Sequence, residues 1–183
     1  MYGIRAMVVT VMLGIGIAGS SVPIAATAFA APSSSISAGT FSTWAAAQKA
    51  AGFPLMKPTQ TFGLLRDGQI IVLSCDSAGK HPKRYVNAVY GSLAKGLLGL
   101  GQNNSSRRCG RTRKATMLGR YQINGASATL VGFCGQRRQP SCRSRRIELS
   151  LTWRRRGISY QAVSYNEWRA TIVGFARKLA VVR

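Results

Sequence analysis

The stretch RYQINGASATLVGF, residues 120–133, decides how the second half of this chain folds. Asn124-Gly125 lies between two strand-like runs, and Asn-Gly is a pair that two-residue hairpin turns prefer because both turn residues adopt positive φ. Residues 147–153, IELSLTW, then alternate apolar and polar side chains, which is typical of a strand with one buried face. We therefore expect residues 118–164 to form an up-and-down antiparallel meander with a further turn at Arg156-Gly157.

The first element of the domain is expected to be a short helix over residues 43–51. Ser42 or Thr43 can cap its start, and Gly52 followed by Pro54 ends it. The alanine-rich composition between these signals favours a helix.

Four strands are expected between this helix and the meander. Asp67-Gly68 lies between two apolar runs, which predicts a hairpin with strands near residues 61–66 and 69–75. Residues 84–92 and 95–102 are expected to form two further strands.

Residues 166–179 predict an amphipathic helix near the end of the chain. Apolar side chains recur at helical spacing, at Trp168, Ile172, Phe175 and Leu179. A helix, about eight mostly antiparallel strands and a final helix indicate an α+β fold. We expect one basic, disulfide-bonded domain over residues 42–183.

The first thirty residues have the pattern of an export signal. Arg5 precedes a long apolar run, and Ala28-Phe29-Ala30 has the small-x-small form of a cleavage site. Residues 1–30 are therefore predicted to be a signal peptide, and residues 31–41 a flexible lead-in. The alternative is an uncleaved membrane anchor, because the apolar run is long enough to span a bilayer. The predicted location is extracytoplasmic: secreted, or in the cell envelope.

The charge of the chain is strongly one-sided. It contains 26 lysines and arginines against 4 aspartates and glutamates, a net charge of +22. A genome rich in G and C would raise the arginine content, but it would not remove carboxylates. The depletion of acids favours an anionic partner, which could be a wall polyanion, an acidic lipid surface or nucleic acid. Arginine dominates over lysine, and it suits forked contacts with phosphate or carboxylate.

The chain has four cysteines, an even number that favours disulfides in an exported protein: Cys75, Cys109, Cys134 and Cys142. The absence of a CxxC spacing and the presence of a single histidine argue against zinc binding and thioredoxin-like chemistry. We favour Cys134–Cys142 with Cys75–Cys109, while a bridge from Cys109 to Cys134 or Cys142 stays open.

The predicted meander would gather most of the cations at one end of the sheet. Alternate loops of an up-and-down sheet share an end, so the loops at residues 107–114 and 134–146 would lie together. Arg154–Arg156 would lie at the far end, more than a Debye length of about 8 Å away. The predicted anion-binding residues are Arg107, Arg108, Arg111, Arg113, Lys114, Arg137, Arg138, Arg143, Arg145 and Arg146. Three of the cysteines fall at this end, where a covalent tie would offset the repulsion between the loops.

No catalytic constellation is evident in the sequence. His81, the single histidine, lies in a basic loop. Ser77-x-x-Lys80 and Ser92-x-x-Lys95 match a pattern of penicillin-interacting enzymes, but no Ser-Asp-Asn or Lys-Thr-Gly motif follows. We expect neither an enzyme nor a metal or other cofactor.

Short motifs along the chain resemble a small exported bacterial domain of unknown function, found attached to anti-sigma-factor-like and lipoprotein-carrier-like proteins. The motifs are AAQKAAGFPLMKPT (46–59), AVYGS (88–92), GLLGLGQ (96–102), INGASATL (123–130), LTWRRRGISYQAV (151–163) and FARKLAVV (175–182). The resemblance implies an α+β sheet domain in an envelope setting and carries over no catalytic residue. The four cysteines and the arginine-rich loops depart from the family's pattern.

These features predict a non-enzymatic binding module that docks an arginine-rich end on an anionic polymer or surface. The alternative is an envelope protein–protein or stress-sensing module that uses the face of its sheet. A third hypothesis, a membrane-disrupting cationic toxin, finds support only in the amphipathic helix predicted at residues 166–179.

Overall fold

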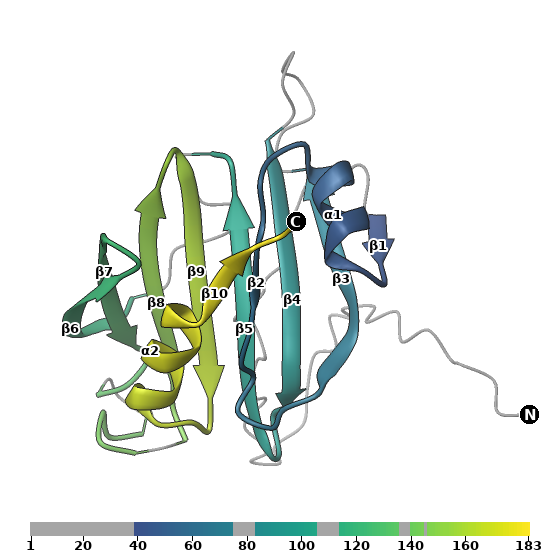
Figure 1. Ribbon diagram of the computed structural model, residues 1–183. Coiled ribbons are helices and arrows are strands. Elements are labelled where there is room, and N and C mark those ends of the chain that lie inside the picture. Colours follow the sequence, from purple (N-terminus) through teal and green to yellow (C-terminus); the bar gives the residue numbers. More distant parts are fainter. Residues whose placement is uncertain (1–38, 75–82, 106–113, 136–139, 145) are drawn as a thin grey trace, which may run out of the picture.

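The computed structural model describes residues 39–74, 83–105, 114–135, 140–144 and 146–183. Within these ranges the chain forms two helices and ten strands (Figure 1). The elements are β1 (Gly39–Phe41), α1 (Trp44–Ala51), β2 (Met56–Pro58), β3 (Arg66–Ser74), β4 (Arg84–Ser92), β5 (Gly96–Asn103), β6 (Thr116–Ile123), β7 (Ala126–Gly132), β8 (Glu148–Arg155), β9 (Ile158–Tyr165), α2 (Arg169–Arg177) and β10 (Leu179–Val181).

Eight of the strands form one sheet in the order β1-β3-β4-β5-β9-β8-β7-β6, and each neighbouring pair is antiparallel. The predicted meander is confirmed, because β6 to β9 are consecutive neighbours joined by the turns Asn124-Gly125 and Arg156-Gly157. Both turns have positive φ at both residues. A large antiparallel sheet of eight strands with two helices is thus confirmed.

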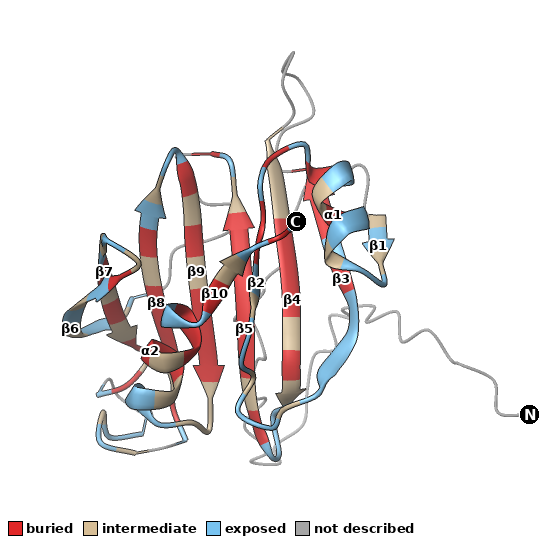
Figure 2. Ribbon diagram, in the orientation of Figure 1, coloured by how far each residue is buried: buried red, intermediate tan, exposed pale blue. Residues whose placement is uncertain are grey.

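One face of the sheet carries all the other elements. Helix α1 packs near β3 and β4, α2 packs on β8 and β9, and the two-stranded ribbon of β2 and β10 lies between the helices (Figure 1). The core fills the space between these two layers, and buried positions recur along the central strands (Figure 2). Fully buried side chains of this core include Leu55, Leu98, Leu100, Leu130, Leu149, Leu151, Ile172 and Phe175.

A buried glutamine ties the β2–β10 ribbon to the sheet. Gln102 on β5 is fully buried, and its Oε1 accepts a hydrogen bond of 2.8 Å from the Met56 N–H. Its Nε2 donates one of 2.7 Å to the Met56 carbonyl. The side chain therefore satisfies both backbone groups of a β2 residue inside the core.

The C-cap of α1 and the cap at its start follow the predicted signals. Thr43 Oγ1 accepts a hydrogen bond from the Ala46 N–H, and Gly52 ends the helix with φ of 73°. The helix expected at residues 43–51 is thus found at Trp44–Ala51. Residues 39–41, the last part of the predicted lead-in, form β1.

The hairpin predicted at Asp67-Gly68 is wrong, because β3 runs straight through these residues. Gly68 has φ of 72°, and the register between β3 and β4 shifts between Asp67 and Ile71. The glycine therefore serves a bulge instead of a turn. In the segment expected as a strand at residues 61–66, Phe62 and Gly63 both have positive φ and form a turn.

The C-terminal helix is shorter than predicted. Helix α2 begins after Trp168, its N-cap, and Lys178 is its C-cap. Trp168, expected on the buried face, is 56% exposed, whereas Val173 and Ala176 join Ile172 and Phe175 in the core. Leu179 is buried but belongs to β10. No helix in the described part of the chain is long and apolar enough to span a membrane.

The opposite face of the sheet is small and polar at its centre. The pairings place Asn87, Gly101, Gln161 and Thr152 in one row across β4, β5, β9 and β8. Asn87 is 7% exposed, and its Oδ1 has no hydrogen-bond partner among the described residues. Val163, on the next row, is fully buried. The centre of this face is therefore not an open surface.

Candidate functional site: the two basic ends of the sheet

The predicted anion-binding residues that the structure describes lie at one end of the sheet, where β7 ends and β8 begins. We call this the disulfide end, because Cys134 and Cys142 are joined there with their Cα atoms 4.9 Å apart. The favoured pairing Cys134–Cys142 is thereby confirmed. Cys75 and Cys109 lie outside the described residues.

The disulfide anchors its loop in the core. Cys134 is fully buried, and Cys142 packs against the same core. The Gly135 N–H donates to the Pro140 carbonyl at 3.0 Å, and Thr116 Oγ1 on β6 donates to the Cys134 carbonyl at 3.1 Å. The loop is thus closed on itself by the disulfide and bonded to β6, the first strand of the meander, through Thr116.

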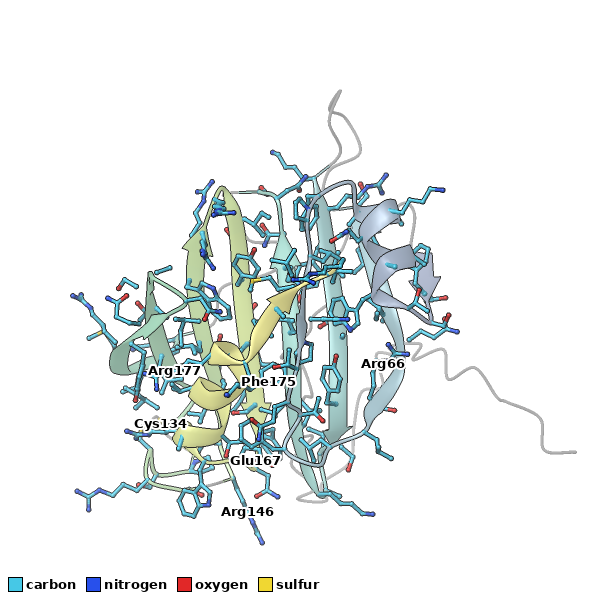
Figure 3. The ribbon with its side chains drawn as sticks, in the orientation of Figure 1. Arg66, Cys134, Arg146, Glu167, Phe175 and Arg177 are labelled. Carbon is cyan, nitrogen blue, oxygen red and sulfur yellow. A yellow bond between two sulfur atoms is a disulfide. The ribbon has the colours of Figure 1, made fainter. Side chains whose placement is uncertain are left out.

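Three of the ten predicted anion-binding residues can be placed, and all three are exposed at the disulfide end: Lys114, Arg143 and Arg146. Lys114 is two residues before β6, while Arg143 and Arg146 belong to the segment that follows the disulfide. Figure 3 shows Arg146 and Cys134 at this end. The other seven lie outside the described residues: Arg107, Arg108, Arg111, Arg113, Arg137, Arg138 and Arg145.

Ser105 and Lys114, the described residues that flank residues 106–113, lie at opposite ends of the sheet. Ser105 accepts a hydrogen bond from Ser159 Oγ through its carbonyl, beside the β8–β9 turn. Lys114 instead precedes Thr116, which is bonded to Cys134. Strand β5 therefore ends at the β8–β9 turn, whereas β6 begins at the disulfide end.

Arg169 is a cation of the disulfide end that the sequence did not single out. Its Nη2 donates a hydrogen bond of 2.9 Å to the Cys142 carbonyl, although the two residues are 27 positions apart. Arg143, Arg146 and Arg169 are all exposed. No local pattern marks Arg169, because its position depends on how α2 packs beside the disulfide loop.

A shallow cleft of about 350 Å³ extends the basic surface along α2. Tyr121, Arg169, Ala170, Val173, Gly174 and Arg177 line it. Arg169 and Arg177 are both exposed and bracket the cleft along the helix. Their guanidinium groups could hold phosphate or carboxylate oxygens.

The opposite end carries five described cations, and we call it the Arg-turn end. Arg154, Arg155 and Arg156 surround the β8–β9 turn, while Lys83 and Arg84 lie at the start of β4. The eight residues of β8 separate the two ends by roughly 26 Å, far beyond a Debye length. The predicted separation of Arg154–Arg156 from the disulfide end is confirmed.

The described carboxylates are not shared equally between the ends. Asp67, Glu148 and Glu167 all lie towards the disulfide end, at the starts of β3 and β8 and just after β9. A Cβ at Gly96 would collide with the Glu167 carboxylate, so Glu167 lies directly over the β4–β5 hairpin (Figure 3). Among the described residues the Arg-turn end contains cations alone.

Aromatic side chains at the Arg-turn end belong to the core. The rings of Trp153 and Tyr160 stack with their centroids 5.3 Å apart. Burial raises the pKa of Tyr160, while Arg155 and Arg156 act in the opposite direction. Both rings are over nine-tenths buried, so they offer no platform for stacking nucleic-acid bases.

Only one of the two Ser-x-x-Lys matches lies within the described residues. Ser92 and Lys95 belong to the β4–β5 turn, where the Lys95 N–H donates to Ser92 Oγ. His81, Ser77 and Lys80 lie outside the described residues. No group of three or more His, Cys, Asp or Glu side chains suited to a metal ion occurs in the described ranges.

No family model, curated protein or solved structure matches this chain. The resemblance to the exported domain of unknown function therefore stays a prediction.

Proposed function

We propose that this chain is a non-enzymatic binding module of the α+β class that works outside the cytoplasm and holds an anionic polymer or surface at its disulfide end. The observation that carries the proposal is the way in which the disulfide loop presents its arginines. Arg143 and Arg146 are exposed on the segment directly after the Cys134–Cys142 bridge, and Arg169 is hydrogen-bonded to the Cys142 carbonyl. Anchoring the backbone that carries the arginines lowers the conformational entropy that is lost on binding.

The disulfide is consistent with a location outside the cytoplasm, where oxidising conditions keep such bonds formed. A predicted export signal over residues 1–30 agrees with this. The ligand classes that fit the charge are a wall polyanion, an acidic lipid surface and nucleic acid, and phosphate oxygens are common to all three.

Charge reversal at the two ends tests the proposal with matched variants of the full, oxidised chain. Arg143→Glu with Arg146→Glu changes the disulfide end, and Arg154→Glu with Arg155→Glu is the control at the Arg-turn end. We expect the first pair to weaken binding to duplex DNA, an anionic wall polymer and acidic vesicles by about tenfold or more, because each cation near an anionic surface contributes about 1 kcal/mol.

Binding should also fall steeply across a salt series if several phosphates are engaged. Equal losses from both pairs of substitutions would contradict a one-ended site. Weak binding to all three ligands, without salt dependence, would overturn the proposed function altogether.

The alternative module, which binds a protein through the face of its sheet, is less well supported. Asn87, Ser150 and Val163 are buried at the centre of the sheet face opposite α1 and α2. A partner recovered by pull-down whose binding does not change with salt would favour this alternative.

A further inference from the structure

Large apolar side chains that remain exposed gather at the disulfide end. Seven such residues occur in the described part of the chain: Phe62, Leu65, Ile71, Leu93, Met117, Trp168 and Val181. Three of them, Leu65, Leu93 and Trp168, lie at the β4–β5 hairpin and the start of α2, and Phe62 packs against Gly174 farther along that helix. We call Phe62, Leu65, Leu93 and Trp168 the apolar tips.

Backbone contacts bring the apolar tips together from three separate segments. The Gly91 N–H donates to the Leu65 carbonyl at 2.8 Å, which places Leu65 beside the hairpin turn that carries Leu93. Tyr165, paired with Leu97 on β5, is followed closely by Trp168 at the N-cap of α2.

Phe62 is held in an unfavourable backbone conformation. Its φ is 55°, a region that bulky residues rarely adopt and that costs roughly 1–2 kcal/mol. Its ring packs over Gly174 of α2, where a Cβ would come within 3.0 Å of the ring, yet 42% of the residue stays exposed. The strained backbone thus places the Phe62 ring against α2 while part of the residue stays exposed.

Cations surround the apolar tips. Lys95 lies in the same turn as Leu93, and Arg169 follows Trp168 directly. Arg146 lies two residues before Glu148, the first residue of β8. Apolar side chains at loop tips with basic neighbours match the interfacial region of an acidic membrane, where tryptophan and basic residues are both favoured.

We infer that the disulfide end docks on a membrane surface that contains acidic lipids. The apolar tips enter the headgroup region, and the neighbouring lysine and arginines contact lipid phosphates. This inference rests on the proposed function and selects one of its ligand classes. A soluble polyanion would engage the cations but would leave the four apolar side chains in water.

Three carboxylates at the disulfide end oppose this docking. Asp67 is exposed two residues after Leu65, whereas Glu148 and Glu167 are both only partly exposed. Glu167 lies over Gly96 in the hairpin, which directs its charge across the turn. The described cations at this end, including the arginines of the disulfide loop, outnumber these acids.

The test measures how the full, oxidised chain partitions onto vesicles of phosphatidylcholine with and without phosphatidylglycerol. Leu65→Ser combined with Leu93→Ser removes two apolar tips, and Ile71→Ser combined with Val181→Ser removes two exposed apolar side chains elsewhere. Residues 1–38 are the same in every variant, so differences between variants report on the tips. Duplex DNA serves as a soluble polyanion in parallel.

We expect the tip variant to lose roughly tenfold or more of its partitioning onto acidic vesicles, because each leucine would otherwise leave water. Its DNA binding and thermal unfolding should stay unchanged, and the control variant should behave like the parent chain. Full vesicle binding by the tip variant, with weaker binding after Arg143→Glu and Arg146→Glu, would overturn the lipid inference and leave the polyanion function standing. Failure of the parent to bind either ligand would remove both.

Discussion

The disulfide end and the Arg-turn end both carry several cations, but they differ in everything around them. The disulfide end has a covalent bridge, the described carboxylates and the four apolar tips. At the Arg-turn end, hydrogen bonds hold the strand ends together. Ser159 Oγ donates to the Ser105 carbonyl, and the Arg84 N–H donates to Asn104 Oδ1. Charge alone therefore does not identify the binding end.

This difference separates two physical requirements of a basic surface. Cations on a two-residue turn, such as Arg156, are positioned by the sheet itself and need no further support. Cations on the longer loop between β7 and β8 need an external tie, which Cys134–Cys142 supplies. The disulfide thus restrains the loop that carries the cations at this end. This restraint supports the disulfide end as the binding end.

The largest effect on stability is expected from Gln102→Met. This substitution weakens the core that both ends of the sheet share, so it separates effects on the core from effects on either end. The substitution keeps the side-chain volume but leaves the N–H and carbonyl of Met56 without partners. Two orphaned buried groups should cost about 3 kcal/mol in the free energy of unfolding, measured by urea denaturation.

Gln122→Met, at an exposed position on β6, is the matched control and should change stability little. Equal stability of the two variants would show that the ribbon of β2 and β10 does not depend on Gln102. Amide exchange should increase in the ribbon for Gln102→Met, with the disulfide loop least affected.

Cys142→Ser should have the next largest effect and should act on one end alone. The bridge closes a short loop of sequence separation 8, and a loop of this size contributes about 2–3 kcal/mol by restricting the unfolded chain. Cys134 would remain as a buried thiol, which packs as a small apolar group. The free energy of unfolding and amide exchange along residues 133–147 are the measurements.

The comparison between the ends breaks if the Cys142→Ser variant loses protection equally at residues 154–158. It is sharpened if exchange increases at the disulfide loop and at the start of α2, because Arg169 donates to the Cys142 carbonyl. Binding to DNA should weaken in parallel, since Arg143 and Arg146 lose their fixed positions.

How much could be predicted from the sequence depends on whether the signal was local. The turns at Asn124-Gly125 and Arg156-Gly157 have the same backbone geometry, and the alternation in residues 147–153 fixes their strands. Asp67-Gly68 carries an equally strong local signal, yet Gly68 serves a bulge. A two-residue turn and a β-bulge both require a positive φ at the glycine, so the dipeptide alone cannot distinguish a turn from a bulge.

Positions that depend on distant packing were not predictable. Arg169 belongs to the candidate site through a bond to a residue 27 positions earlier. Trp168 fits the apolar spacing of a longer helix, but α2 begins one residue later and leaves its ring exposed. The strands β2 and β10 are far apart in the sequence, yet they pair with each other. Each has only three residues, which is too few to show a periodic pattern.

The smallest effect is expected at the Arg-turn end, from Arg156→Asn. Arg156 has φ of 49° and Gly157 has φ of 79°, nearly the values of 49° and 81° at Asn124-Gly125. Asparagine tolerates this left-handed conformation better than arginine, so the substitution should stabilise the protein by about 0.5 kcal/mol. Arg155→Asn, in the extended backbone of β8, is the control and should give no such gain.

The same variant measures whether the Arg-turn end takes part in binding. If only the disulfide end engages an anion, Arg156→Asn should raise the free energy of unfolding and leave the salt dependence of DNA binding unchanged. A decrease in the slope of log K against log salt by about one would mean that Arg156 contacts a phosphate. In that case the arginine at an unfavourable turn position is kept for binding, and the anionic partner extends along the length of the sheet from one basic end to the other.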